Sequence, residues 1–318
     1  PWLLICGYYI MLLPSDLRSN WNVWTETLLL SRFAAPTSAG ILFTMLAGAG
    51  LKNSWVYQKT RVLAIFDDLD TILLMIPLQI FMIGMKWQLG VVVVVVFACL
   101  YFGWTRLDRF RMSQSWGSIL GYSTILVFAF QGLYAISKQI FGTDGAIHIE
   151  VLLPAFVLGM VMKTKHSKSK TDAKVSDIIS YLFMFLVGFS APLFVGVDFA
   201  ATAGDCVIGQ VGSMTWGEIA MHVAIATLLS NIGKMVPMLF YHSLTERLAL
   251  SIGMFTRGEV GAGIIFVSLG YGLGGPLLAI SLLTILSNLI LTGGFVIIVR
   301  RLALKADAAA VKADAAKA

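Results

Sequence analysis

The chain has 318 residues, of which 58% are hydrophobic and only 13% are charged. A soluble protein of this length needs about twice that share of charged residues to cover its surface, so the composition excludes an ordinary soluble domain. Apolar runs of about 17 to 25 residues recur along the chain, and each is long enough to cross a hydrocarbon layer about 30 Å thick. Alternating strands of the outer-membrane-barrel type are absent from the sequence. We therefore predict an all-α, multi-pass integral membrane protein in a lipid bilayer.

Charge and cysteine content remove two further classes. The formal net charge is +6. Membrane topology accounts for this excess of Lys and Arg, so we expect no nucleic-acid partner. The three cysteines, Cys6, Cys99 and Cys206, lack the spacing of metal ligands and are too few for a disulfide framework. We interpret them as free thiols, and we expect no cofactor.

The first apolar run, PWLLICGYYIMLL, is too short to be a complete span. No basic segment precedes it and no small-residue cleavage site follows it, which disfavours a secretory signal peptide. We expect it to be the end of a helix whose start is missing from the sequence.

Nine further spans are predicted, at residues 24–50, 62–84, 88–104, 116–137, 147–162, 178–198, 218–241, 248–270 and 276–299. The loops between them test this count, because Lys and Arg accumulate on the cytoplasmic side. Seventeen Lys and Arg residues lie in one set of alternate loops and the tail, and only Arg18, Lys86 and Lys138 lie in the other set. We therefore expect the basic loops and the C-terminus to face the cytoplasm, with residues 300–318 forming a frayed, Ala-rich helix.

Seven ionisable residues remain inside the predicted spans. They are Arg32, Asp67, Asp68, Asp70, Lys234, Arg257 and Glu259. An ionisable group at mid-bilayer costs about 2.5–3.5 kcal/mol on insertion scales. We therefore expect these residues to mark a functional site.

Asp67 and Asp68 are adjacent in the run VLAIFDDLDTILLMIPLQI. Neighbouring residues of a helix point in different directions, so one carboxylate can face a cavity while the other faces a neighbouring helix. Two carboxylates this close at low dielectric do not both ionise easily unless a cation compensates them. A proton, a sodium ion or a lysine ammonium would serve, and carboxylate oxygens suit hard cations. This pattern favours a cation and proton site over a structural salt bridge, for which one acid would suffice.

Lys234 lies near the middle of its predicted span, in LLSNIGKMVPMLF. It is about seven residues, or ~10 Å, from the cytoplasmic end, which disfavours snorkelling of the ammonium group to the interface. A buried lysine needs either a carboxylate partner or the loss of its proton. We expect that partner to be one of the aspartates.

Two spans carry helix-breaking residues at their centres. SRFAAPTSAGILF contains Pro36, which frees a backbone carbonyl, beside the hydroxyls of Thr37 and Ser38. SIGMFTRGEVGAGII contains four glycines, including Gly258, around Thr256. Irregular backbone at membrane depth is tolerated where it lines a cavity or is buried in protein. A pair of interrupted helices in the two halves of a chain indicates a transporter binding site.

The order of these features is mirrored. The Asp-bearing span directly follows the first interrupted span, whereas the Lys-bearing span directly precedes the second. This order is what inverted repeats produce.

Three stretches of the chain resemble the cation/proton antiporter superfamily, in its bacterial sodium/proton form with a DD motif. APTSAGILFTMLAGAGLKNSWVYQKTRVLAIFDDLD resembles the family's first break and DD pair, and GKMVPMLFYHSLTERLALSIGMFTRGEVGAGII resembles its Lys-bearing helix and RGEV-type break. FMFLVGFSAPLFVGVDF is similar to a further family segment, more loosely. The helices that usually precede the first stretch are missing here.

The resemblance implies the sodium/proton antiporter fold, with inverted repeats and two crossing discontinuous helices in a core domain. It also implies a scaffold domain that forms a homodimer, and a bacterial inner membrane location. The predicted parts are the first half of the core with a linker helix at 1–104, scaffold helices at 105–200, the second half of the core at 201–299, and the tail at 300–318.

The resemblance also implies roles for individual residues. Asp68 resembles the carboxylate that binds the monovalent cation and the proton, and Thr37 lies at the break that completes this site. Asp67 resembles the partner that bridges to Lys234 when the site is empty. The DD form with a matching Lys is associated with electrogenic exchange of two protons for one cation.

Other positions of the motif supply charge compensation and the helix breaks. Arg257 and Glu259 match the compensating charges of the second break. Pro36, Ser38, Thr256 and Gly258 match the two breaks themselves. Arg32 and Asp70 depart from the family pattern, and for Asp70 a partner role for Arg32 or another basic group is favoured over a proton relay.

The function expected from these observations is exchange of a monovalent cation for protons, with no enzymatic activity. Na⁺ is the favoured cation. A K⁺/H⁺ exchanger or K⁺ efflux system on the same fold is the alternative, because Na⁺, Li⁺ and K⁺ all accept these oxygen ligands. An intramembrane aspartyl protease would need one Asp on each of two helices and a GxGD motif, whereas the acids here crowd onto one helix. A non-transporting scaffold or inactive fragment is disfavoured because the polar site is intact.

Overall fold

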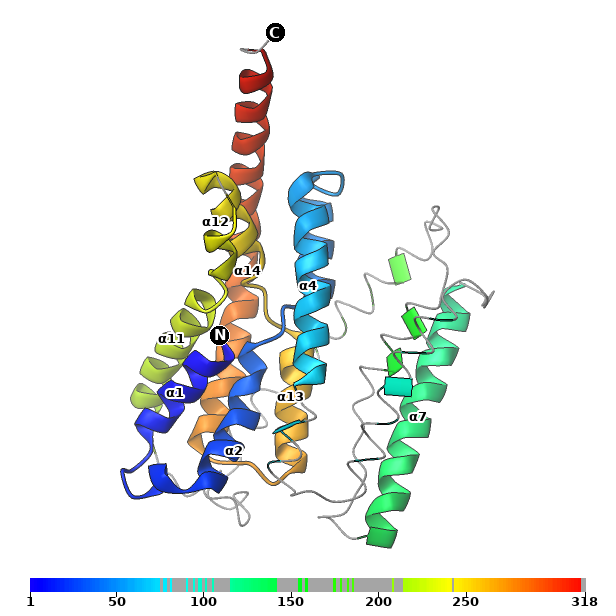
Figure 1. The fold of residues 1–318 in the computed structure, drawn as a ribbon, viewed down its shortest axis with the longest axis vertical. Helices are drawn as coiled ribbons and strands as arrows, with labels where there is room; N and C mark the ends of the chain where they lie inside the picture. The colour runs from blue at the N-terminus through cyan, green and yellow to red at the C-terminus, as the bar shows by residue number, and fades with distance from the viewer. Residues whose placement is uncertain are drawn as a thin grey trace. The chain divides into compact units, whose positions relative to one another are not determined.

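The computed structural model describes residues 1–74, 115–141, 214–241 and 243–315, together with isolated residues between 77 and 208. Within these ranges the chain is helical and contains no strand, as predicted from composition (Figure 1). Much of the predicted spans 88–104, 147–162 and 178–198 lies outside the described residues, as do Cys99 and Cys206.

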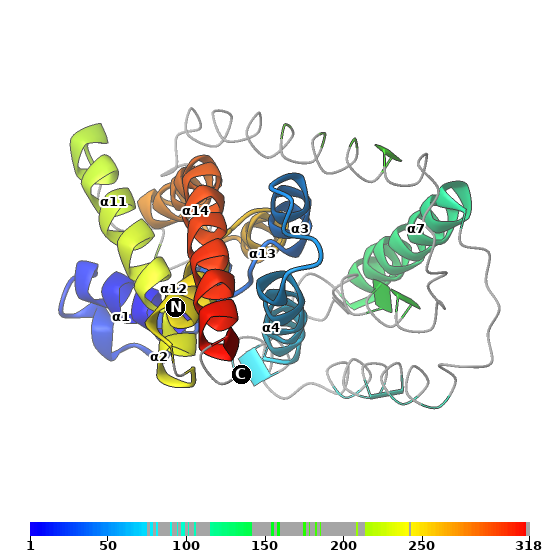
Figure 2. The ribbon, with the colours of Figure 1, turned by 90° about the horizontal axis from the view of Figure 1, so that it is seen from above.

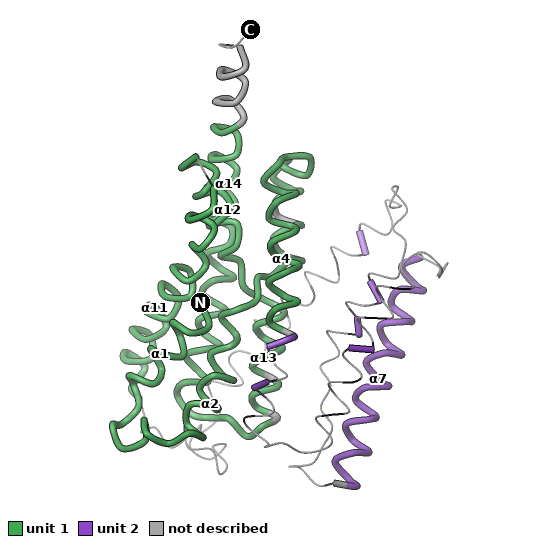
Figure 3. The backbone as a smooth tube through the Cα atoms, viewed as in Figure 1, with its two compact units in different colours: residues 1–71, 180–318 green, residues 72–179 purple. Residues whose placement is uncertain are grey.

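The chain divides into two compact units (Figure 3). Unit 1 contains residues 1–71 and 180–318, and unit 2 contains residues 72–179. The main described element of unit 2 is α7 (Trp116–Phe141), which agrees with the span predicted at 116–137. The division into core and scaffold domains stays a prediction.

Unit 1 is built around α14 (Pro276–Ala315), a single helix of 40 residues. Pro276 stands at its first position, where a missing N–H costs nothing. The tight connection before it requires Gly272 and Gly275, whose φ angles of 77° and 85° are in the left-handed region. The helix continues past the predicted end of the last span at residue 299, because Ala and Lys are strong helix formers.

Two helices pack along α14 and lie beside it in Figure 2: α11 (Trp216–Ile232) and α12 (Leu244–Gly253). Both begin at hydroxyl caps. Thr215 and Glu218 form a reciprocal capping box at the start of α11, and Ser243 accepts a hydrogen bond from the backbone of Glu246 in α12. These caps satisfy N–H groups that have no partner within the first turn of a helix.

The remaining helices of unit 1 are α1 (Trp2–Leu12), α2 (Trp21–Ser31), α3 (Ala39–Gly48), α4 (Trp55–Leu73) and α13 (Glu259–Gly270). α1 packs against α2 and α11, and α13 packs against α14. The span predicted to begin at residue 62 begins seven residues earlier, at Trp55. Ser54 explains this, because its hydroxyl accepts a hydrogen bond from Tyr57 N–H and caps the helix outside its apolar part.

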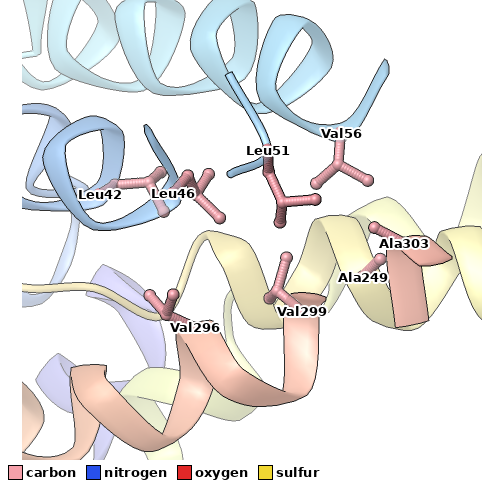
Figure 4. Close-up of a cluster of buried hydrophobic side chains, with 8 residues drawn as sticks. All are labelled: Leu42, Leu46, Leu51, Val56, Ala249, Val296, Val299 and Ala303. Carbon is pink, nitrogen blue, oxygen red and sulfur yellow. The ribbon is translucent and has the colours of Figure 1, made fainter. Parts of the chain in front are cut away.

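An apolar cluster joins α3 and the start of α4 to α12 and α14 (Figure 4). Its members are Leu42, Leu46, Leu51, Val56, Ala249, Val296, Val299 and Ala303. Each is at most 7% exposed, so the burial of apolar side chains holds these four helices together.

Four described helical segments are long and apolar enough to cross a membrane. They are Trp21–Gly48 taken across its break, Trp116–Ile140, Trp216–Leu239 and Pro276–Ala306. Their length and composition identify an all-α protein of membrane character.

Candidate functional site

The first predicted helix break is present, and it covers residues 32–38. α2 ends at Ser31, a 3-10 turn, η2 (Arg32–Ala34), follows, and α3 begins only at Ala39. Pro36 explains the interruption, because proline has no N–H and clashes with the preceding helical turn. Thr37 and Ser38 are buried there, at 0% and 1% exposure.

The second predicted break is also present, between Gly253, where α12 ends, and Glu259, where α13 begins. Thr256 and Arg257 lie in it, each 1% exposed. Gly258 is required by close packing: a Cβ atom at this position would lie 2.6 Å from Ile41 Cδ1 and 3.1 Å from Ser38 Oγ.

The two breaks are hydrogen-bonded to each other. Ser38 N–H donates to the carbonyl of Thr256 at 3.0 Å, and Thr256 Oγ1 donates back to the carbonyl of Ser38 at 3.4 Å. Thr37 Oγ1 lies 3.3 Å from the carbonyl oxygen of Met254. Each break thus satisfies polar backbone groups that the other leaves without helical partners.

An ion pair lies against this crossing. Lys234 Nζ donates a short hydrogen bond to Asp67 Oδ2, and the side chains are 6% and 23% exposed. Thr37 Oγ1 lies 2.8 Å from the same carboxylate oxygen. The Thr37 hydroxyl has one proton, so it can donate to either Asp67 or Met254 O at one time. Asp67, Lys234 and Thr37, which are far apart in sequence, therefore form one contact group.

Lys234 is not in the middle of a continuous helix, which corrects the prediction of one helix over 218–241. α11 ends at Ile232, Lys234 lies in the following turn, and a 3-10 helix, η5 (Val236–Leu239), continues the segment. Pro237 accounts for this, because it has no N–H to continue the α-helical ladder. The ammonium group consequently follows the C-terminus of α11, where the helix dipole favours a positive charge.

Arg257 binds backbone carbonyls. Nη1 donates to Met254 O at 3.0 Å and to Thr256 O at 3.3 Å, and Nη2 donates to Ser230 O at 3.2 Å. The guanidinium group therefore caps the end of α12 and reaches the last turn of α11. Its positive charge compensates buried carbonyl groups that have no helical hydrogen-bond donor because the helix is interrupted.

The other three predicted acids, Asp68, Asp70 and Glu259, lie on α4 and α13. Asp68 follows Asp67 on α4 and is partly buried, whereas Asp70 is exposed. Glu259 is the first residue of α13, and its side chain lies outside the described part of the structure.

Arg32, one of the partners predicted for Asp70, is 1% exposed. Its Nε and Nη2 both donate to the carbonyl of Thr71, one turn beyond Asp67 on α4. The first break thus contacts α4 at two levels, through Thr37 at Asp67 and through Arg32 at Thr71. Arg32 therefore links the first break to the Asp-bearing helix.

Sequence reasoning missed two contributors. The carbonyl of Met254 is within hydrogen-bonding distance of both Thr37 Oγ1 and Arg257 Nη1, and no side-chain pattern reveals a backbone acceptor. Polar residues of α14 were also overlooked, although their spacing was readable: Ser281, Thr284, Asn288 and Thr292 recur every three or four residues in an apolar run.

A comparison of the sequence with known protein families finds no match, and no curated protein sequence matches it either.

Proposed function

We propose that this protein is a secondary transporter that exchanges a monovalent cation, Na⁺ in the first instance, for protons. The observation that carries the proposal is the buried Lys234–Asp67 ion pair beside two hydrogen-bonded helix breaks. Buried ion pairs at a transporter midplane are costly and are retained where they serve an ion pathway. The setting is a bacterial inner membrane with the C-terminus in the cytoplasm.

In the proposed cycle, Lys234 neutralises Asp67 while the site is empty. The neighbouring carboxylate of Asp68 receives the cation, and carbonyl and hydroxyl oxygens at the breaks complete a shell of hard ligands. The arriving charge weakens the attraction between Lys234 and Asp67, so the ammonium group releases a proton. Asp68 gives up its own proton when it binds the cation, so two protons leave for each cation that enters. Release of the cation on the other side and return of one proton each to Asp68 and Lys234 restore the empty state.

The arrangement also argues against proteolysis. An aspartyl protease needs two carboxylates from different helices sharing one proton. Here the three aspartates predicted for the site, Asp67, Asp68 and Asp70, all lie on α4, and Asp67 is bound to an ammonium group.

The substitution Asp68→Asn tests the proposal. It keeps the size of the side chain and removes the charge that would hold the cation, so cation-dependent proton flux in everted vesicles should be abolished. Expression and thermal stability should stay near those of the parent. Flux at near parental rates would remove Asp68 from the mechanism, and parallel assays with Na⁺, Li⁺ and K⁺ separate the sodium from the potassium exchanger.

A further inference from the structure

Polar side chains of α11 and α14 face one another inside unit 1. Thr227, Ser230 and Asn231 have the spacing that places them on one face of α11, and Thr284 and Asn288 share a face of α14. Asn288 Nδ2 lies 3.5 Å from Ser230 Oγ, so the two faces meet. These five residues are called the α11–α14 polar cluster below.

The cluster is buried, yet its polar atoms are incompletely paired. Ser230, Thr284 and Asn288 are 0% exposed, and Thr227 and Asn231 are 8% exposed. Within the described part of the chain, the atoms without a hydrogen-bond partner include Thr227 Oγ1, Asn231 Oδ1, Thr284 Oγ1 and Asn288 Oδ1. Buried polar atoms are nearly always hydrogen-bonded, because burial without a partner is costly. A bound ligand would supply the missing partners.

The charge beside the cluster selects the class of ligand. Arg257 donates to Ser230 O at 3.2 Å, and its Nε atom also has no partner among the described residues. The guanidinium group repels a cation, and the amide oxygens of Asn231 and Asn288 disfavour an anion. Water satisfies both, since it donates to amide oxygens and accepts from the Nε–H group. Threonine hydroxyls can donate a hydrogen bond to water or accept one from it.

The cluster lies next to the ion pair. Lys234 follows Asn231 in the turn after α11, and its backbone N–H donates to Asn231 O at 3.0 Å. We propose that the α11–α14 polar cluster is an internal water site that exchanges with bulk solvent. Its further role, to carry protons between Lys234 and solvent, rests on the proposed function.

Thiol reactivity tests the site in membranes, without an ion gradient. Thr284→Cys, made in a chain whose three native cysteines are replaced by alanine, is treated with 2-hydroxyethyl methanethiosulfonate, a small polar reagent. The matched control is Leu282→Cys, because Leu282 is 4% exposed and points to nearly the opposite side of the same helix. Modification of Thr284→Cys should be at least about tenfold faster than that of Leu282→Cys. The reagent attacks the thiolate form, and apolar surroundings suppress ionisation of the thiol.

A cysteine introduced on α11 provides a second test of the site. Thr227→Cys should react as fast as Thr284→Cys, and each exchange of Thr for Cys changes the volume little, so folding should be retained. Adding Asn288→Leu to Thr284→Cys should slow its reaction toward that of Leu282→Cys. Equal, slow rates at Thr284→Cys and Leu282→Cys would mean that the interior is dry and would overturn the proposal. Equal, fast rates would overturn it too, because the reagent would then enter by general opening of the helices.

The outcome is separable from that of the transport proposal. A reactive site in a protein that shows no exchange would leave the water site in place and overturn only its proton-carrying role. An unreactive site in an active exchanger would overturn the water site alone.

Discussion

Ser38 and Thr256 are hydrogen-bonded in both directions, although they are 218 positions apart in the chain. The backbone N–H of Ser38 donates to Thr256 O at 3.0 Å, and Thr256 Oγ1 donates to Ser38 O at 3.4 Å. An interrupted helix is costly in a membrane unless its freed backbone groups find partners. The two breaks supply such partners to each other, so each stabilises the irregular backbone of the other.

The first prediction concerns the close packing of this crossing. A Cβ atom at Gly261 would lie 2.9 Å from the carbonyl oxygen of Phe33 and 3.2 Å from Ile285 Cδ1. Gly261→Ala should therefore lower the free energy of unfolding by about 1–3 kcal/mol, as overpacked sites do. Thermal unfolding in detergent measures this. Gly263→Ala is the control on the same helix, because a Cβ atom there meets nothing within 4 Å. Equal unfolding temperatures for both variants would contradict the packing argument.

The second prediction concerns the hydroxyl of Thr37. Thr37→Val keeps the shape of the side chain and removes its hydrogen bond to Asp67. It also removes one of the break hydroxyls proposed to complete the ligand shell of the cation. Polar contacts to charged groups contribute about 1.5–3 kcal/mol, so the cation concentration for half-maximal flux should rise by at least about tenfold. Thr27→Val is the control, because Thr27 is equally buried and its hydroxyl donates to Val23 O within its own helix. A parental value in Thr37→Val would mean that Thr37 serves the backbone of the break alone.

The third prediction is that Lys234 sets the pH dependence of transport. Lys234→Gln removes one exchangeable proton and leaves Asp67 without its counter-charge. Residual exchange should remain, with a changed number of charges moved per cycle and a shifted pH profile.

The control for this prediction is Lys52→Gln, at an exposed lysine of the loop before α4. If Lys234 only braces the packing, its Gln variant would lose thermal stability and keep the parental pH profile. Measuring unfolding and the flux-against-pH curve on one preparation distinguishes the two roles.

The fourth prediction concerns the electrical sign of transport. If two protons exchange for one cation, one net charge crosses in each cycle. Moving one charge across a potential of 100 mV changes its free energy by about 2.3 kcal/mol. A potential of 100 mV imposed on proteoliposomes should therefore change the equilibrium cation gradient about 50-fold. Asp68→Asn proteoliposomes supply the background. A gradient that ignores the imposed potential would indicate one proton per cation.

Local sequence properties were enough to predict the helical, membrane character of the chain and the positions of both breaks. Apolar run length depends on bilayer thickness, and a proline or a cluster of glycines interrupts a helix whatever its neighbours are. For that reason Pro36 and Gly258 indicated the breaks directly. The same local signals overestimated the continuity of the Lys-bearing segment and placed the start of α4 too late, since caps and Pro237 set those limits.

Partners at the site depend on how distant segments cross. The residue pattern alone allowed Lys234 to pair with any of the nearby aspartates, and only the packing of the turn after α11 against α4 selects Asp67. The carbonyls bound by Arg257 and Arg32, and the meeting of Asn288 with Ser230, likewise have no local signature. A hydrogen bond requires its donor and acceptor atoms to be in direct contact. That proximity is a property of the assembled helices, because hydrophobicity and helix propensity act along a segment and carry no information about which segment lies beside it.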